Sequence, residues 1–168
     1  VLWAGTRGDG IFKRRVETSR AWRAVNSNLV IARVRDVAVS PLYDVDGIAF
    51  AATLSGGAYR TINRGGSWEP INRGLPVEDR ALYSLALSPS TFTFGTLFAG
   101  STEGRVFRSP RNLISWTQVF TIPVSFAAQS VRVEDFAISP SFSRDGTLFF
   151  VTNQGTVFKS TASGSKGT

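Results

Sequence analysis

Short apolar runs alternate with turn residues along the whole chain, and no helical periodicity extends beyond two turns. Runs of this length, bounded by Gly, Asn, Asp or Pro, predict β-strands joined by tight turns. We therefore expect an all-β fold without helices. The expected strands, in chain order, are 1–6, 11–14, 22–25, 34–39, 48–53, 58–61, 67–71, 82–87, 96–101, 105–109, 115–120, 133–138, 147–152 and 156–160.

The strand pattern repeats. In each copy a strand ends at Ser-Pro, because proline lacks the amide donor that a strand needs, and an apolar strand follows a turn glycine. The three copies begin at Ser40, Ser88 and Ser139, with spacings of 48 and 51 residues. Four strands in a period of roughly 50 residues predict the four-stranded antiparallel blades of a β-propeller.

A blade cannot bury both of its faces alone, so it must stack against neighbouring blades. The repeat predicts a partial blade over 1–30, complete blades over 31–76 and 77–124, and a partial blade over 125–168. This is about three and a half blades, whereas a propeller needs about four to close. Exposed apolar sheet faces would aggregate. We therefore expect a segment of a larger propeller, with further blades from the same longer chain or from another subunit.

One turn of the second unit carries a recognisable motif. Thr61, Asn63, Gly65, Ser67 and Trp68 match the pattern Ser/Thr-x-Asp/Asn-x-Gly-x-Ser/Thr-Trp. This turn resembles the Asp-box, or BNR repeat, which forms the hairpin between the third and fourth strands of a blade. In such a hairpin the asparagine would bind backbone amides and the glycine would allow positive φ. The tryptophan would be buried between blades.

The other copies of the motif are degraded. Trp116 and Trp22 keep the tryptophan in the third and first units, and we expect Trp22 to lie in a blade core. Propellers with Asp-boxes include sialidases, xyloglucan-type glycoside hydrolases, sortilin-like receptors and photosystem assembly factors. The box is structural in all of them, so it does not select a function. The resemblance implies a secreted, periplasmic or cell-surface location.

Only two residues are candidates for catalysis; both are carboxylates, and both are weak candidates. Asp36 and Asp135 take equivalent positions at the start of the expected innermost strands, with Ser84 at the same position between them. A glycoside hydrolase needs two carboxyl groups facing each other across its substrate. However, the two residues are two blades apart, and a structural hydrogen bond also explains a repeated Asp. Sialidase activity is disfavoured, because the Arg-Ile-Pro motif of that family is absent.

The chain has a net charge of +7, with 19 Lys and Arg residues against 12 Asp and Glu residues. Such an excess favours anionic partners, although solubility alone can also explain it. The densest basic cluster lies between residues 13 and 23, and a basic residue follows the aromatic residue of each third strand. Ordinary strand alternation explains the second pattern equally well. The candidate binding residues are Arg14, Arg15, Arg20, Arg23, Arg60 and Arg108.

The composition excludes several classes of chemistry. The chain has no Cys and no His, which excludes disulfides, thiol catalysis and Cys/His zinc sites. The Asp-Gly turns do not match a calcium loop, so we expect no metal and no cofactor. No apolar run is long enough to span a membrane, and there is no clear signal for nucleic-acid binding.

The sequence therefore favours a non-catalytic binding or assembly scaffold. It would present loops and a basic face to a protein or an anionic glycan. The alternative is a fragment of a glycan-acting glycoside hydrolase with a xyloglucanase-like or sialidase-like propeller.

Overall fold

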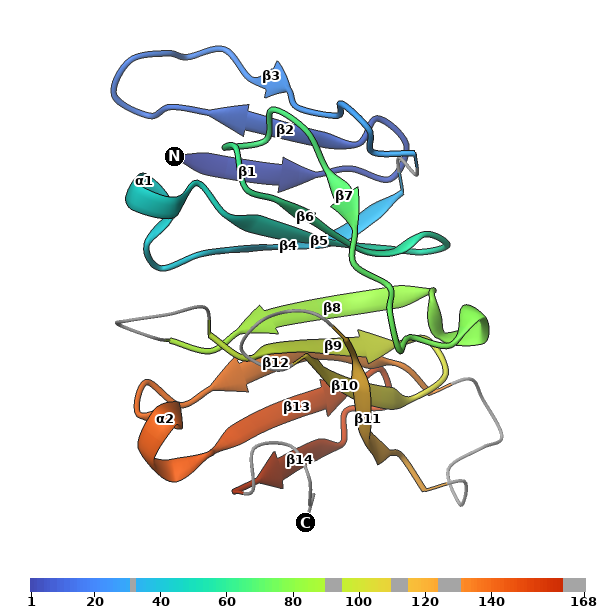
Figure 1. Ribbon diagram of the computed structural model, residues 1–168. Coiled ribbons are helices and arrows are strands. Elements are labelled where there is room, and N and C mark those ends of the chain that lie inside the picture. The colour runs from blue at the N-terminus through green and yellow to red at the C-terminus, as the bar shows by residue number, and fades with distance from the viewer. Residues whose placement is uncertain (31–32, 90–94, 110–114, 124–130, 162–168) are drawn as a thin grey trace.

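The structure is a computed structural model, and it describes residues 1–30, 33–89, 95–109, 115–123 and 131–161. Its strands form four antiparallel sheets that follow one another in chain order (Figure 1). The predicted all-β fold, a segment of a propeller built from antiparallel blades, is confirmed. We call the four sheets the first to the fourth blade.

Each blade is a simple up-and-down sheet. The first blade contains β1 (Leu2–Gly5), β2 (Ile11–Arg14) and β3 (Arg23–Ala24). The second contains β4 (Val34–Val39), β5 (Ala49–Thr53), β6 (Gly57–Thr61) and β7 (Glu69–Pro70). The third contains β8 (Leu82–Leu87), β9 (Leu97–Ser101), β10 (Arg105–Ser109) and β11 (Thr117–Thr121). The fourth contains β12 (Val133–Ile138), β13 (Leu148–Thr152) and β14 (Val157–Ser160).

The expectation of no helices is wrong at three short segments. Two four-residue helices, α1 (Tyr43–Asp46) and α2 (Phe142–Asp145), follow the Ser-Pro strand ends, and a 3₁₀ turn, η1 (Val77–Asp79), precedes β8. The helices α1 and α2 end at Gly47 and Gly146, which have left-handed φ angles of 65° and 58°. Glycine ends helices in this conformation without a steric penalty. A single helical turn is too short to show a periodicity in the sequence.

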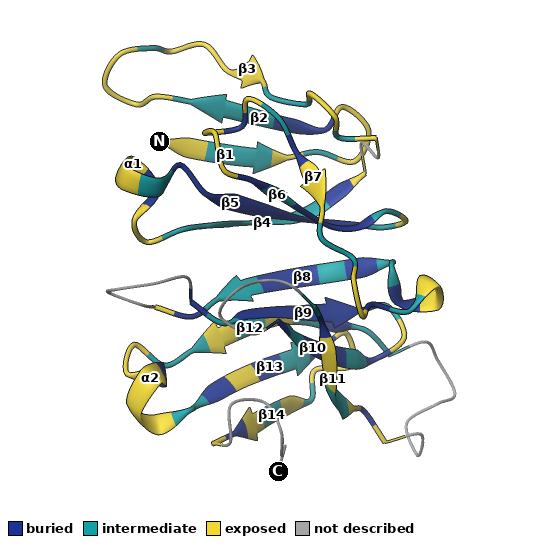
Figure 2. Ribbon diagram, in the orientation of Figure 1, coloured by how far each residue is buried: buried dark blue, intermediate teal, exposed yellow. Residues whose placement is uncertain are grey.

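The hydrophobic core lies at the seams between successive blades. Three buried clusters follow the chain: one joins the first and second blades around Trp68, the next joins the second and third around Trp116, and the last joins the third and fourth around Phe98. The middle strands β5 and β9 are buried along their whole length (Figure 2). This is expected for strands that are covered on both faces.

The fourth blade is covered on one side only by the described chain. Along β13 buried residues alternate with more exposed ones, and the side chain of Phe149 is 39% exposed. On the neighbouring strand β14, Val157 is also exposed. Alternation of this kind is typical of a sheet with one packed face.

Close approach of neighbouring blades requires glycine at two equivalent positions. A Cβ atom on Gly100 of β9 would lie 2.5 Å from the Cβ atom of Val133 on β12. A Cβ atom on Gly5 of β1 would lie 2.7 Å from Cγ1 of Val34 on β4. Since real Cβ contacts are longer than this, any side chain here would push the blades apart.

Candidate functional site

The first candidate carboxylate, Asp36, joins two blades. Its Oδ1 accepts a hydrogen bond from the amide of Val37 at 2.7 Å, and its Oδ2 accepts one from the amide of Leu85 on β8 at 2.8 Å. Burial raises the pKa of Asp36 above its ordinary value, while these two amides act in the opposite direction. Each carboxylate oxygen therefore accepts a hydrogen bond from a backbone amide, and one of these two amides belongs to the next blade.

The equivalent residues of the next two blades continue this pattern. The hydroxyl of Ser84 donates to the carbonyl oxygen of Val133 on β12 at 2.9 Å. Asp135 accepts from the amide of Phe136 at 2.7 Å and is exposed. Within the described residues, Asp135 has no hydrogen bond to a further blade. Asp36 and Ser84 each link their innermost strand to the next one, which is the structural alternative considered for this position.

A cluster on the innermost strands was not expected from the sequence. The guanidinium carbon atoms of Arg35 and Arg132 lie 3.8 Å and 4.6 Å from the centre of the Tyr83 ring. Arg132 also forms an ion pair with Glu134 at 2.6 Å. Cations near an aromatic face are attracted by its quadrupole. The contacts join residues about 50 positions apart, so only the repeat register could have suggested them.

The hairpin Thr61–Trp68 is held by its own side chains. Oδ1 of Asn63 accepts from the amide of Ser67 at 2.8 Å and from the hydroxyl of Thr61 at 2.9 Å. Nδ2 of Asn63 donates to the hydroxyl of Ser67 at 2.9 Å. Gly65 has a φ angle of 84°, and its amide donates to the Thr61 hydroxyl. The structure thus contains the backbone bond and the positive φ that the motif predicts.

The tryptophan that ends this hairpin reaches into the preceding blade. Nε1 of Trp68 donates to the carbonyl oxygen of Val25 at 2.7 Å, and Nε1 of Trp116 donates to that of Ile71 at 2.5 Å. Both indoles are buried. Trp22 differs from them, because it is 43% exposed and lies 5.5 Å from the guanidinium carbon of Arg14. The expectation of a core position for Trp22 is therefore wrong for the described chain, in which no blade precedes the first.

The predicted basic cluster lies on the β2–β3 hairpin of the first blade. Arg15, Arg20 and Arg23 are exposed, and Arg14 is half-buried. Among the described residues, none of these four forms an ion pair within 4.0 Å. The structure thus brings them together on one hairpin and leaves their charges unneutralised.

The basic residues of the third strands do not form a uniform ridge. Arg60 forms an ion pair with Glu69 in its own blade. The Nζ atom of Lys159 lies 5.8 Å from the ring of Phe149, and Nε of Arg108 is buried without a hydrogen-bond partner among the described residues. The structure does not bring Arg60 and Arg108 into one site with the β2–β3 cluster.

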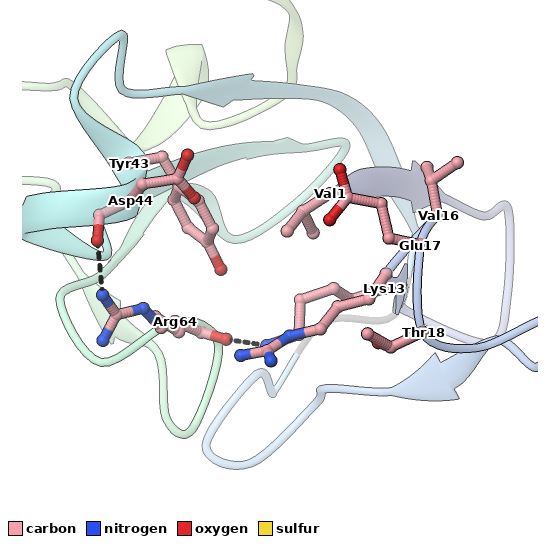
Figure 3. Close-up of a pocket in the computed structure, with 9 residues that line it drawn as sticks. Val1, Lys13, Val16, Glu17, Thr18, Tyr43, Asp44 and Arg64 are labelled. Carbon is pink, nitrogen blue, oxygen red and sulfur yellow. Dashed lines mark hydrogen bonds between the residues drawn. The ribbon is translucent and has the colours of Figure 1, made fainter.

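A pocket of about 420 Å³ lies between loops of the first two blades (Figure 3). The first blade contributes β2 and the loop that follows it, and the second contributes α1 and the Thr61–Trp68 hairpin. Arg15 is the only candidate binding residue in its lining. The residues that line it are Val1, Lys13, Arg15, Val16, Glu17, Thr18, Tyr43, Asp44 and Arg64.

Comparison with known proteins identifies the fold. No family model matches the chain, and no curated protein matches it. A GH74 xyloglucanase from Xanthomonas campestris superposes with a TM-score of 0.71 at 19% identity, over 99% of this chain and 28% of the xyloglucanase. YCF48 bound to D1 peptide gives a TM-score of 0.65 at 20% identity, over 96% of this chain and 47% of that one. The extracellular domain of a one-component system from B. thetaiotaomicron gives 0.65 at 17% identity, over 94% of this chain and 19% of that domain.

These structures support a β-propeller fold for this chain. At such low identity they establish the fold alone. The chain spans less than half the length of each of these three structures. Within the residues that the structure describes, no helix is long and apolar enough to cross a membrane.

Proposed function

We propose that this chain is a non-catalytic binding or assembly segment of a larger Asp-box β-propeller. The observation that supports this best is the role of Asp36. Both of its oxygens accept backbone hydrogen bonds, so neither is free to take part in a reaction without breaking a link between blades. A buried acceptor that loses its partners costs about 1–3 kcal/mol, which disfavours a second role in catalysis.

The partner of this scaffold is a protein or an anionic glycan. The exposed residues Arg15, Arg20 and Arg23, with the half-buried Arg14, provide a basic face that no acidic side chain of the described residues neutralises. Basic surfaces of this kind attract anionic partners. A neighbour in structure, YCF48, binds a peptide, which supports a binding role for a propeller of this type.

Further blades complete the ring in this proposal. Trp22 is exposed at the position where Trp68 and Trp116 are buried against a preceding blade. Asp135 is exposed at the position where Asp36 binds the following blade. At each end of the stack, therefore, a residue is exposed whose equivalent in an inner blade contacts a neighbouring blade. A secreted or cell-surface location agrees with the extracellular neighbour from B. thetaiotaomicron.

The second candidate function is glycan hydrolysis. It is favoured by the likeness to a xyloglucanase, which covers 99% of this chain. In that case Asp36 or Asp135 would act with a carboxylate on a facing blade outside this segment.

A hydrolysis screen on the full-length protein separates the two functions. Release of reducing sugar from xyloglucan, pectin and sialylated glycans is measured for the wild type and for Asp36→Asn and Asp135→Asn, with Glu103→Gln at an exposed turn as the control. The scaffold predicts no turnover by any variant. Turnover that is lost in either Asp variant and kept in the control would refute it.

A further inference from the structure

The pocket between the first and second blades gathers three positive charges from two segments that are distant in the sequence. Lys13 lies on β2, Arg15 lies in the loop after it, and Arg64 lies in the Thr61–Trp68 hairpin. Burial lowers the pKa of Lys13, and the neighbouring charges of Arg15 and Arg64 lower it further. Lys13 is therefore repelled by both guanidinium groups, and an anion beside it would relieve this repulsion.

Arg64 is held in a conformation that arginine rarely adopts. Its φ angle is 60°, in the left-handed region, which costs a non-glycine residue of the order of 1 kcal/mol. Its guanidinium donates to the carbonyl oxygen of Asp44 on α1 at 2.7 Å, and its own carbonyl accepts from the ammonium of Lys13. The bond to Asp44 lies within the second blade and the bond to Lys13 crosses the seam, and together they hold Arg64 at the pocket wall.

The remaining lining supplies hydrogen-bond acceptors and hydroxyl groups. Figure 3 shows Tyr43, Asp44 and Arg64 on one side of the pocket and Glu17 and Thr18 on the other. Burial raises the pKa of the Tyr43 hydroxyl, while nearby guanidinium groups act in the opposite direction. The phenol is therefore a donor at neutral pH, and the carboxylate of Glu17 lies on the opposite side of the pocket.

Aromatic rings of the blade seam pack against the residues that line the pocket. The ring of Tyr43 packs edge-to-face on Trp3 with centroids 5.7 Å apart, and Trp3 packs in the same way on Trp68 at 6.0 Å. The ammonium of Lys13 lies 5.4 Å from the Trp3 ring. These contacts tie the position of the pocket residues to the core of the seam, so the site is pre-organised.

We propose that this pocket binds an acidic sugar residue, whose carboxylate or sulfate group lies among Lys13, Arg15 and Arg64. The carboxylates of Glu17 and Asp44 accept hydrogen bonds from its ring hydroxyls. The volume of about 420 Å³ falls in the range of small-molecule sites, roughly 300–1,000 Å³. A single Asp or Glu side chain of a peptide would leave most of it empty and would not use the acceptors.

This inference rests on the proposed binding function and specifies one ligand class for it. It assigns a role to Tyr43 and Arg64, which lie outside the predicted basic cluster, and to Lys13, which begins that cluster. If the pocket does not bind an acidic sugar, only this inference fails. The scaffold proposal is tested separately, by whether the full-length protein hydrolyses glycans.

Calorimetric titration of the full-length protein tests the site with four probes. They are digalacturonic acid, its neutral counterpart galactobiose, sodium sulfate, and a short Glu-rich peptide. We expect digalacturonic acid to bind at least tenfold more tightly than the other three, and its affinity to fall with added salt. Equal binding of galactobiose, sulfate or the peptide, or no binding of digalacturonic acid, would overturn the assignment.

Two variants test the residues. Arg64→Asn removes the guanidinium and keeps a residue that tolerates the left-handed region, and Arg15→Ala changes an exposed loop residue only. Each should weaken digalacturonic acid binding at least tenfold with an unchanged melting temperature. Arg144→Ala, which removes an exposed arginine of α2 in the fourth blade, should leave binding unchanged. Unchanged affinity in both pocket variants, or an equal loss in Arg144→Ala, would overturn the proposal.

Discussion

Three tryptophans at one repeat position allow a direct test of how the blades continue. Trp68 is 2% exposed, and its indole N–H binds the carbonyl of Val25 in the preceding blade. Trp116 does the same with Ile71. Trp22 holds the equivalent position in the first blade but is 43% exposed. If a further blade precedes the first one, Trp22 should be buried by it in the full-length protein.

The substitution Trp→Phe gives a predictable penalty at each position. Phenylalanine keeps an aromatic ring but removes the N–H, so the facing carbonyl loses its partner. An unpaired buried polar group costs about 1–3 kcal/mol, and the smaller ring leaves a void that adds roughly 0.5–1 kcal/mol. We expect Trp68→Phe and Trp116→Phe to lower the free energy of unfolding by about 1.5–4 kcal/mol. If Trp22 stays uncovered in the full-length protein, Trp22→Phe should lower the free energy of unfolding by less than about 0.5 kcal/mol.

The measurement is urea unfolding of the full-length protein, followed by circular dichroism, for the three Trp→Phe variants. Val45→Ala, at an exposed position of α1, is the control for a substitution that removes no buried contact. The proposal of a preceding blade predicts that Trp22→Phe costs as much as Trp68→Phe. A loss for Trp22→Phe no larger than that of the control would refute the inference that the repeat continues before the first blade.

Substitutions at three further residues, with their controls, test the links between and within the blades. Gly100→Ala should destabilise the protein by about 1–3 kcal/mol through overpacking, whereas Gly8→Ala, with no atom within 4 Å of the added Cβ, should have little effect in thermal melts. Asn63→Ala should cost about 1–2 kcal/mol through lost hydrogen bonds, and Asn63→Asp, which keeps the acceptor oxygens, should recover most of it. The raised pKa of Asp36 means that the folded state binds its proton more tightly than the unfolded state, so stability falls as pH rises from the ordinary value of 3.8 through the raised one. Denaturant titrations should therefore show a larger penalty for Asp36→Asn near pH 4 than at pH 7, and a penalty that grows with pH would contradict this sign.

The strands were predictable because each one carries a local signal. Alternation, turn residues and the Ser-Pro ends located all fourteen strands of the structure to within a few residues. The hydrogen bonds of Asn63 were also local, since they lie within one hairpin. The helices α1 and α2 were missed because a single turn leaves no periodic pattern and Asp-Gly also indicates a tight turn.

Contacts between blades could not be predicted in the same way. The guanidinium groups of Arg35 and Arg132 meet the ring of Tyr83 only because the innermost strands β4, β8 and β12 lie side by side. The pocket likewise joins Arg64 to Lys13, which is 51 residues earlier in the chain. No local pattern specifies such pairs. The burial of Trp22 was predicted from its repeat position alone, and the structure shows that burial also needs the neighbouring blade.

The solution mass of the 168-residue segment on its own tests the central claim most directly. Both end faces of the stack carry exposed apolar and polar groups whose counterparts inside it are covered by a further blade. Size-exclusion chromatography with light scattering should therefore show self-association or aggregation of the isolated segment. A stable, monodisperse monomer would contradict the claim that these blades belong to a larger propeller.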